Sequence, residues 1–267
     1  MSWLQALVLG VVQGLTEFLP ISSTAHLRLV PHWLGWPDPG AAVSAVIQLG
    51  TLIAVFAYFA ADIRRLLAAA WQGVRQRNLH ASPDTRLAWS LLPGTVPIAA
   101  FGLGFKEFVE TGARSLELIA AALILLALGL LAAERLGRRD LSLDRLGFWQ
   151  IQFVGLCQAL ALVPGASRSG TTIMGGLLVG LGRADAARFS FLLGLPAIGA
   201  SGLLEFADLV AGGLGGVGLA SLAVAVVAAA ISGYWSIGFL LRFVARRGTY
   251  AFIVYRILLG GIILLAR

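Results

Sequence analysis

The sequence predicts an all-α, polytopic membrane protein made of two inverted-topology repeats, each with one re-entrant helical hairpin and three transmembrane helices. Hydrophobic residues form 58% of the 267-residue chain and charged residues only 12%, about half the charged fraction of a typical soluble domain. The second observation is a set of six long apolar stretches, uncharged except for Arg256 in the last, and the third is a pair of apolar segments broken by proline and serine. An ordinary soluble domain is excluded by this composition.

The six apolar stretches predict the transmembrane helices. Crossing about 30 Å of hydrocarbon takes roughly 17 to 25 helical residues, or slightly fewer where flanking side chains snorkel. The third and fourth stretches have 16 residues each and sit at the lower limit. The predicted spans are 39–61, 87–105, 118–133, 189–204, 219–241 and 248–266.

Two further regions, 1–35 and 146–182, follow a different pattern. Each contains an apolar run, a loop with proline and serine at 20–26 or 164–170, and a second, shorter apolar run. Proline ends a helix because it lacks an N–H and clashes with the preceding turn. We therefore predict that each region is a hairpin that enters and leaves the membrane on the same side.

The distribution of basic residues gives the orientation. With two re-entrant hairpins and six crossings, one side of the membrane receives the loops 62–86, 134–145, 183–188 and 242–247, which hold 14 Lys and Arg residues. The opposite side receives Arg28, Lys106, Arg114 and Arg267. The positive-inside rule places the first set in the cytoplasm. Short basic clusters between apolar runs also favour membrane loops over a nucleic-acid surface, despite the net charge of +7.

The chain also carries a weak internal repeat. An offset of 144 superimposes Pro20 on Pro164, and a one-residue gap brings Gln13 onto Gln158. Three spans follow each hairpin. Because three is an odd number, the second half starts on the opposite side of the membrane from the first, so two similar halves would have inverted orientations in the membrane. We predict one integral membrane domain, 1–267, with repeats 1–133 and 146–267.

Few ionisable side chains lie inside the apolar runs. Each costs about 2.5–3.5 kcal/mol at the centre of a membrane helix by insertion scales, so such residues usually mark function. Glu17 is the only acidic one, Arg168 and Arg256 are the basic ones, and His26 follows the first proline. Gln13 and Glu17 are four residues apart and share one helix face. We interpret Arg256 as structural, because the rest of its span is a plain apolar helix.

The two loops are predicted to meet and form one polar site, because non-helical backbone at membrane depth must line an enclosed or wet cavity. Glu17, His26 and Arg168 supply its ionisable groups. Arginine and hydroxyl groups favour an anion such as phosphate, and a helix that starts near Thr171 would add backbone N–H groups. Catalysis, anion transport and a purely structural ion pair all stay open from the residues alone. The candidate substrate-binding residues are Gln13, Ser22, Thr24, Ser167, Ser169, Thr171 and Thr172.

The segments QGLTEFLPISSTAH at 13–26 and PGASRSGTT at 164–172 resemble the two signature segments of the bacterial undecaprenyl-diphosphate phosphatase, or bacitracin-resistance protein, family. The resemblance extends through IQLG at 47–50 and YR at 255–256. It implies a multi-pass enzyme of the bacterial cytoplasmic membrane that removes the terminal phosphate from undecaprenyl diphosphate, the spent carrier lipid of cell-wall synthesis. It also implies a site that faces the periplasm or cell exterior, a divalent cation such as Mg²⁺ or Ca²⁺, and, by analogy, a homodimer.

The resemblance further implies a role for each matching residue. Glu17 would act as acid, base or metal ligand, Ser23 as nucleophile or hydrogen-bond donor, and His26 in proton transfer. Gln13 stands where relatives often carry glutamate, so a cation held by Glu17 would have Gln13 as a weak second ligand. Phosphate binding would fall to Arg168 with Ser167 and Thr172.

Two alternatives accompany this prediction. Ser23 could attack the terminal phosphorus with Glu17 or His26 as general base, or an activated water could attack directly. The alternative function is a flippase or transporter of a lipid phosphate or another anion, because inverted repeats with broken helices are a transport architecture.

Overall fold

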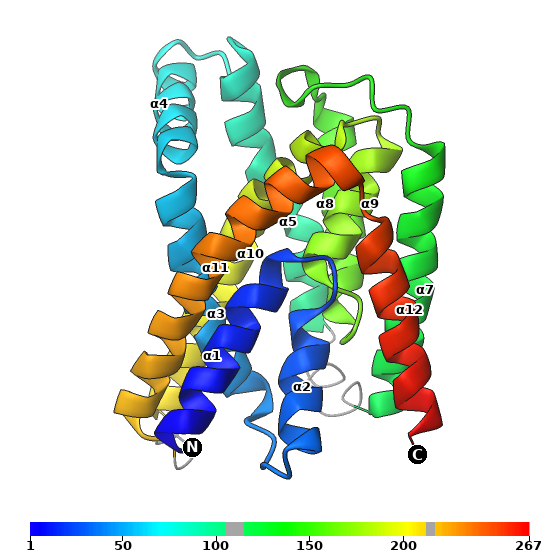
Figure 1. Ribbon diagram of the computed structural model, residues 1–267. Coiled ribbons are helices and arrows are strands. Elements are labelled where there is room, and N and C mark those ends of the chain that lie inside the picture. Colours follow the sequence, from blue (N-terminus) through cyan, green and yellow to red (C-terminus); the bar gives the residue numbers. More distant parts are fainter. Residues whose placement is uncertain (105–114, 212–216, 267) are drawn as a thin grey trace.

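The computed structural model describes residues 1–104, 115–211 and 217–266, and the helices form one bundle (Figure 1). No β-strand occurs in these three ranges, which confirms the all-α prediction. Phe105, at the end of the second predicted span, lies outside them, as do Lys106, Arg114 and Arg267. The α-helices are α1 (Trp3–Phe18), α2 (Ser23–Trp33), α3 (Gly40–Tyr58), α4 (Ala60–Arg75), α5 (Pro83–Gly104), α7 (Leu116–Leu136), α8 (Phe148–Ala159), α9 (Arg168–Leu178), α10 (Arg183–Ala211), α11 (Leu219–Arg247) and α12 (Tyr250–Leu265).

The longest apolar helices coincide with predicted spans. Four of them, α5, α7, α10 and α11, are long and apolar enough to cross a membrane. Helices α3 and α4 form a fifth candidate that is bent by 78° at its break, and α12 is apolar but shorter, with 16 residues. The chain is therefore a multi-pass membrane protein, whereas six full crossings stay a prediction.

Helices α1–α2 and α8–α9 form two hairpins at the regions with the proline–serine loops. In Figure 1 the turn of α1–α2 points toward the middle of the bundle from the end that holds both chain termini. The turn of α8–α9 points toward the middle from the other end. The two hairpins thus run in opposite senses along the bundle.

The second helix of each hairpin begins with the same backbone geometry. Ser22 caps α2 with a φ of 74°, and Ser167 caps α9 with a φ of 70°. A positive φ is uncommon outside glycine. In both caps the serine oxygen accepts from the N–H three residues later. Ser22 and Ser167 are 145 positions apart in the sequence. Gln13 and Gln158 have the same separation, and the two prolines of the turns are separated by one position fewer. The two hairpins thus share the local geometry of one helix start.

Several basic loops gather at one end of the bundle. The α4–α5 connection, the segment between α7 and α8, and the α11–α12 corner lie at the end opposite the two termini (Figure 1). The fully buried Glu134 accepts hydrogen bonds there from Arg183 Nε at 2.6 Å and Thr249 Oγ1 at 2.7 Å, and it pairs with Arg139 at 3.3 Å. One carboxylate therefore joins α7, α10 and the start of α12.

Candidate functional site

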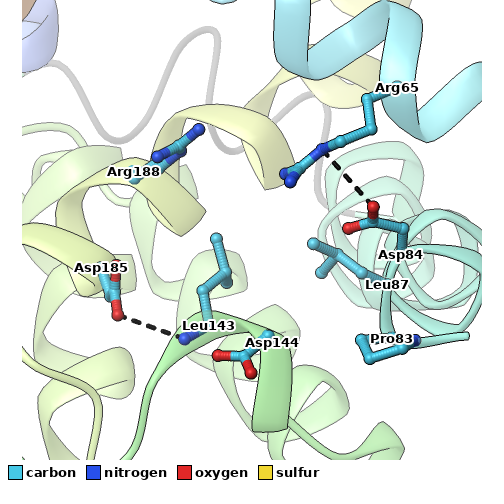
Figure 2. Close-up of a pocket in the computed structure, with 8 residues that line it drawn as sticks. All are labelled: Arg65, Pro83, Asp84, Leu87, Leu143, Asp144, Asp185 and Arg188. Atoms are coloured by element: carbon cyan, nitrogen blue, oxygen red, sulfur yellow. Dashed lines mark hydrogen bonds and ion pairs between the residues drawn. The ribbon is translucent and has the colours of Figure 1, made fainter.

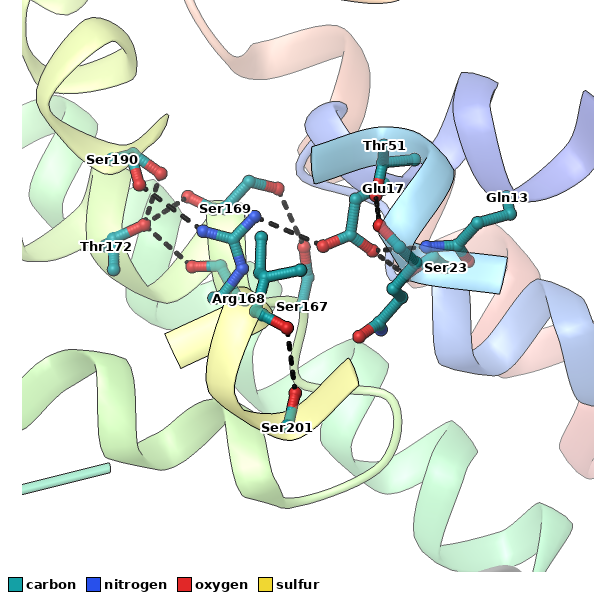
Figure 3. Close-up of polar contacts among 12 residues, drawn as sticks. Gln13, Glu17, Ser23, Thr51, Ser167, Arg168, Ser169, Thr172, Ser190 and Ser201 are labelled. Carbon is teal, nitrogen blue, oxygen red and sulfur yellow. Dashed lines mark hydrogen bonds and ion pairs between the residues drawn. The ribbon is translucent and has the colours of Figure 1, made fainter. Parts of the chain in front are cut away.

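The turns of the two hairpins touch each other, as the sequence predicts. Ser169 Oγ, at the start of α9, donates to the backbone oxygen of Leu19 at 3.1 Å. In the other direction, the backbone N–H of Gly165 donates to Thr24 Oγ1 at 3.3 Å. Side chains from α1, α2 and α9 therefore converge at one place, which Figure 3 shows.

Glu17 lies at the centre of this polar cluster and is only 5% exposed. Its Oε1 accepts from an Arg168 terminal nitrogen at 3.1 Å. Its Oε2 accepts from Ser23 Oγ at 2.6 Å and from Gln13 Nε2 at 2.9 Å. A buried carboxylate needs such compensation, because desolvation of an unpaired charge costs several kcal/mol. The ion pair that spans 151 positions of sequence is thus formed, and a serine hydroxyl points at the same carboxylate.

Arg168 is held by α10 as well as by Glu17. Its other terminal nitrogen donates to the backbone oxygen of Ser190 at 3.3 Å, and the hydroxyls of Thr172 and Ser190 are hydrogen-bonded to each other. The Nε of Arg168 is buried and has no hydrogen-bond partner within the described ranges. A buried donor without a partner costs about 1–3 kcal/mol. The Nε atoms of Arg28, Arg86, Arg139 and Arg188 share this property, so the Nε of Arg168 does not by itself mark an anion site.

Most of the predicted substrate-binding hydroxyls hold the turns together. Thr171 and Thr172 donate to the backbone oxygen of Arg168 at 3.0 and 2.7 Å. The Ser22 and Ser167 side chains cap their helices and also contact Thr24 and Ser169, respectively. Substrate contacts from these five hydroxyls and from Ser169 stay a prediction, while their contacts here stabilise the two helix starts.

His26 has hydrogen-bond partners outside the Glu17 cluster. Its Nδ1 lies 2.7 Å from the backbone oxygen of Ser22, and its Nε2 lies 2.6 Å from the hydroxyl of Tyr255 on α12. No hydrogen bond joins His26 to Glu17, Ser23 or Arg168 in the part of the chain that the structure describes. Of the four predicted catalytic residues, three are directly linked and His26 flanks them.

Sequence reasoning missed two residues of this neighbourhood. Ser190 supports Arg168 and Thr172, and Tyr255 binds His26. Ser190 is one of two serines in the predicted span 189–204, so its polarity in that run was the available signal. Tyr255 entered the sequence argument only through the YR pair of the family resemblance.

A divalent cation would find few protein ligands at this site. Among the described residues no group of three or more His, Cys, Asp and Glu side chains could hold a metal. The Oε1 of Gln13 is buried without a partner, and its Nε2 faces Glu17. Amide and carboxylate oxygens are suitable ligands when substrate phosphates complete the coordination of Mg²⁺. Gln13 and Glu17 could therefore be the protein ligands of a divalent cation that binds together with the phosphate substrate.

Another polar cavity, of about 190 Å³, lies between the ends of α4, α5 and α10 (Figure 2). Its charges are already partnered: Arg65 pairs with Asp84 at 3.5 Å, and Asp185 accepts from the backbone N–H of Leu143 at 3.2 Å. Arg188, which also lines the cavity, pairs with Asp62 on α4. Three aspartates and two arginines line this cavity, so its net charge is negative and it is less suited to an anion than the Glu17 site.

Comparisons with known proteins agree with the motifs at the two turns. A family model described as "Bacitracin resistance protein BacA" matches residues 6–262. The chain belongs to this family. A BacA relative from Chloroherpeton thalassium is 50% identical, with 99% of this chain and 96% of the relative covered. Relatives from Myxococcus xanthus, at 50% identity with 99% and 89% covered, and from Chlorobaculum tepidum, at 48% with 97% and 95% covered, carry the same name, undecaprenyl-diphosphatase.

Proposed function

We propose that this BacA-family protein hydrolyses undecaprenyl diphosphate to undecaprenyl phosphate and inorganic phosphate. The observation that carries the proposal is that one buried carboxylate, Glu17, binds both the Arg168 guanidinium and the Ser23 hydroxyl. An anion binder and an activated hydroxyl are what phosphoryl transfer needs at one place. The names of the three relatives supply the substrate class.

The proposal includes the inverted topology. Matched caps 145 residues apart, hairpins that run in opposite senses, and basic loops at one end all support repeats 1–133 and 146–267 with six crossings. The positive-inside rule then orients the basic end toward the cytoplasm. The protein would lie in the bacterial cytoplasmic membrane with its site open to the periplasm or exterior. The homodimer expected from the resemblance stays a prediction.

In the proposed reaction Ser23 Oγ attacks the terminal phosphorus. The serine proton passes to Glu17 Oε2, which already accepts from this hydroxyl at 2.6 Å. The new O–P bond forms as the anhydride P–O bond breaks, and undecaprenyl phosphate leaves with the electron pair. Glu17 passes this proton to the departing undecaprenyl phosphate and becomes a base again. Water then cleaves the phosphoserine as Glu17 takes a proton from the water, and this proton returns to Ser23 Oγ as the serine–phosphate bond breaks. His26 is the less suitable base for Ser23, since both its ring nitrogens have other partners.

Arg168 would bind the diphosphate during both steps. Its guanidinium would donate to phosphate oxygens, while its contacts with Glu17 and Ser190 hold the planar group in place. Preorganised donors of this kind stabilise charge that develops in the transition state. Glu17 and Gln13 would hold a divalent cation together with the substrate oxygens, and the cation would supply further charge neutralisation.

The direct test is release of inorganic phosphate from undecaprenyl diphosphate by the purified protein in detergent. We expect turnover that a chelator abolishes and that added Mg²⁺ or Ca²⁺ restores. A flippase would release no phosphate, and this result would replace the proposed function with the transport alternative. Turnover that persists with the chelator would remove the cation from the proposal but leave the hydrolysis.

The serine nucleophile has its own test. We expect Ser23→Ala to lower kcat by about 10³-fold, because removal of a nucleophile leaves only binding and electrostatic catalysis. Acid quenching of the wild type with labelled substrate should trap phosphoserine at position 23. Ser44→Ala removes a hydroxyl that only bonds to its own helix at Gly40 and is the matched control. If Ser23→Ala kept a tenth or more of the rate, direct attack by water would be the mechanism.

A further inference from the structure

The pair formed by His26 and Tyr255 joins the first hairpin to the last helix. His26 lies one helical turn after Ser23 on α2 and is 8% exposed, so it shares a helix face with the proposed nucleophile. Tyr255 comes from α12 and is 41% exposed. The two rings are stacked, with centroids 5.7 Å apart and planes at 9°. Contact across 229 positions of sequence therefore sets the orientation of the imidazole.

The backbone partner of His26 defines its tautomer. The oxygen of Ser22 lies 2.7 Å from Nδ1 and can only accept, so Nδ1 carries a hydrogen. In the neutral imidazole Nε2 is then the acceptor, and the tyrosine hydroxyl 2.6 Å away must donate to it. The tautomer follows from this pair of partners. Nε2 is consequently the one ring nitrogen able to take up a proton.

The neighbouring residue on α12 secures the same region. Arg256 donates to the backbone oxygens of Pro20 and Gly165, which lie in the two hairpin turns. Helix α12 thus fixes the backbone of both turns with one residue and the imidazole with the preceding one. Because Arg256 anchors α12 against the turns, Tyr255 has little freedom to leave His26.

We propose that Tyr255 is a positioning residue for the hydrolysis, and that it holds His26 as the Nδ1–H tautomer with Nε2 directed at α12. This inference rests on the proposed function and adds to it a residue that acts through His26. Without the tyrosine hydroxyl, a buried Nε2 would lose its donor, and the imidazole could rotate or change tautomer. His26 Nδ1 binds the backbone oxygen of Ser22, the residue before the proposed nucleophile, so a rotated imidazole would release the backbone that orients Ser23. Correct orientation of a nucleophile is worth large rate factors even when no bond to the substrate is lost.

The test is Tyr255→Phe, which keeps the stacked ring and removes only the hydroxyl. We expect kcat to fall about tenfold while KM changes by less than roughly twofold, since binding of the diphosphate does not involve this group. Tyr250→Phe is the matched control, because Tyr250 lies on the same helix with 43% exposure. It should retain the wild-type kcat and KM.

A spectroscopic readout separates positioning from a general structural effect. The chain has three histidines, so ¹⁵N-histidine labelling at about pH 8, where an ordinary imidazole is neutral, gives few signals, and His26→Gln identifies the one from His26. The wild type should show the Nδ1–H tautomer, and Tyr255→Phe a mixture of tautomers. Unchanged ¹⁵N signals in Tyr255→Phe, or a kcat equal to that of the Tyr250→Phe control, would overturn the inference. Failure of the proposed function would appear differently, as no phosphate release by the wild type.

Discussion

Replacing Arg168 with lysine is expected to lower kcat for phosphate release by about 10²-fold, and replacing Glu17 with glutamine by about 10³-fold. Lysine keeps the charge but lacks the planar fork, so it cannot bind Ser190, Glu17 and a phosphate oxygen at the same time. Glutamine keeps the shape of Glu17 but cannot accept the proton of Ser23. Steady-state release of phosphate from undecaprenyl diphosphate measures both effects.

The matched control for arginine is Arg28→Lys. Arg28 lies on α2, pairs with Asp38 at 3.5 Å and is 30% exposed, outside the Glu17 cluster. It should keep a rate close to that of the wild type. The rate of the double variant Glu17→Gln, Arg168→Lys should be within a few-fold of the rate of Glu17→Gln alone. The reason is that the rate losses from two groups that act on one ligand do not multiply. A fully multiplicative loss, or an Arg168→Lys enzyme with half the normal rate, would contradict the shared site.

The pairing at the centre of this site could be predicted from the sequence for a physical reason. Few ionisable side chains lie inside the apolar runs, and each is too costly there without compensation. Glu17 and Arg168 therefore had one obvious partner each, and the structure joins them at 3.1 Å. Pro20 and Pro164 marked the two breaks in the same way, since proline cannot continue a helix.

Other parts could not be predicted because they depend on packing between distant helices. Nothing in the apolar run around Ser190 distinguishes a hydroxyl that supports Arg168 from one that bonds to its own helix. Tyr255 had no sequence signal beyond the YR pair of the resemblance, and its contact with His26 appears only in the folded chain. The sequence also left His26 as a base for Ser23, whereas the imidazole is directed at Tyr255. Such contacts arise from three-dimensional packing and leave no periodic pattern.

Replacing Arg256 with leucine is expected to have the largest effect on stability. The side chain is fully buried, and its four hydrogen bonds all go to backbone oxygens. Two of these oxygens belong to the hairpin turns, at Pro20 and Gly165, and two belong to α7, at Ala122 and Leu123. Loss of these donors should lower the free energy of unfolding by about 4 kcal/mol, at roughly 1 kcal/mol for each bond.

Thermal unfolding in detergent can be followed with a thiol-reactive dye, because Cys157 is the single cysteine of the chain and is buried in the folded state. We expect a lower midpoint for Arg256→Leu and an intermediate one for Arg256→Lys, whose compact ammonium cannot reach both turns and α7 together. Arg246→Leu makes the same change at an exposed position of α11 and should stay within about 0.5 kcal/mol of the wild type.

The kinetic result decides what Arg256 is for. The Arg256 guanidinium contacts both hairpin turns, and Glu17 belongs to one hairpin and Arg168 to the other. If this contact sets the distance between the turns, Arg256→Lys should have a lower kcat even under conditions where it is fully folded. Since Arg256 touches only backbone, addition of guanidinium ion to a smaller variant, Arg256→Ala, should restore part of the rate. An Arg256→Lys enzyme with a lowered midpoint but a normal kcat would limit this residue to stabilising the bundle, and would mean that the Glu17–Arg168 pair keeps its geometry without it.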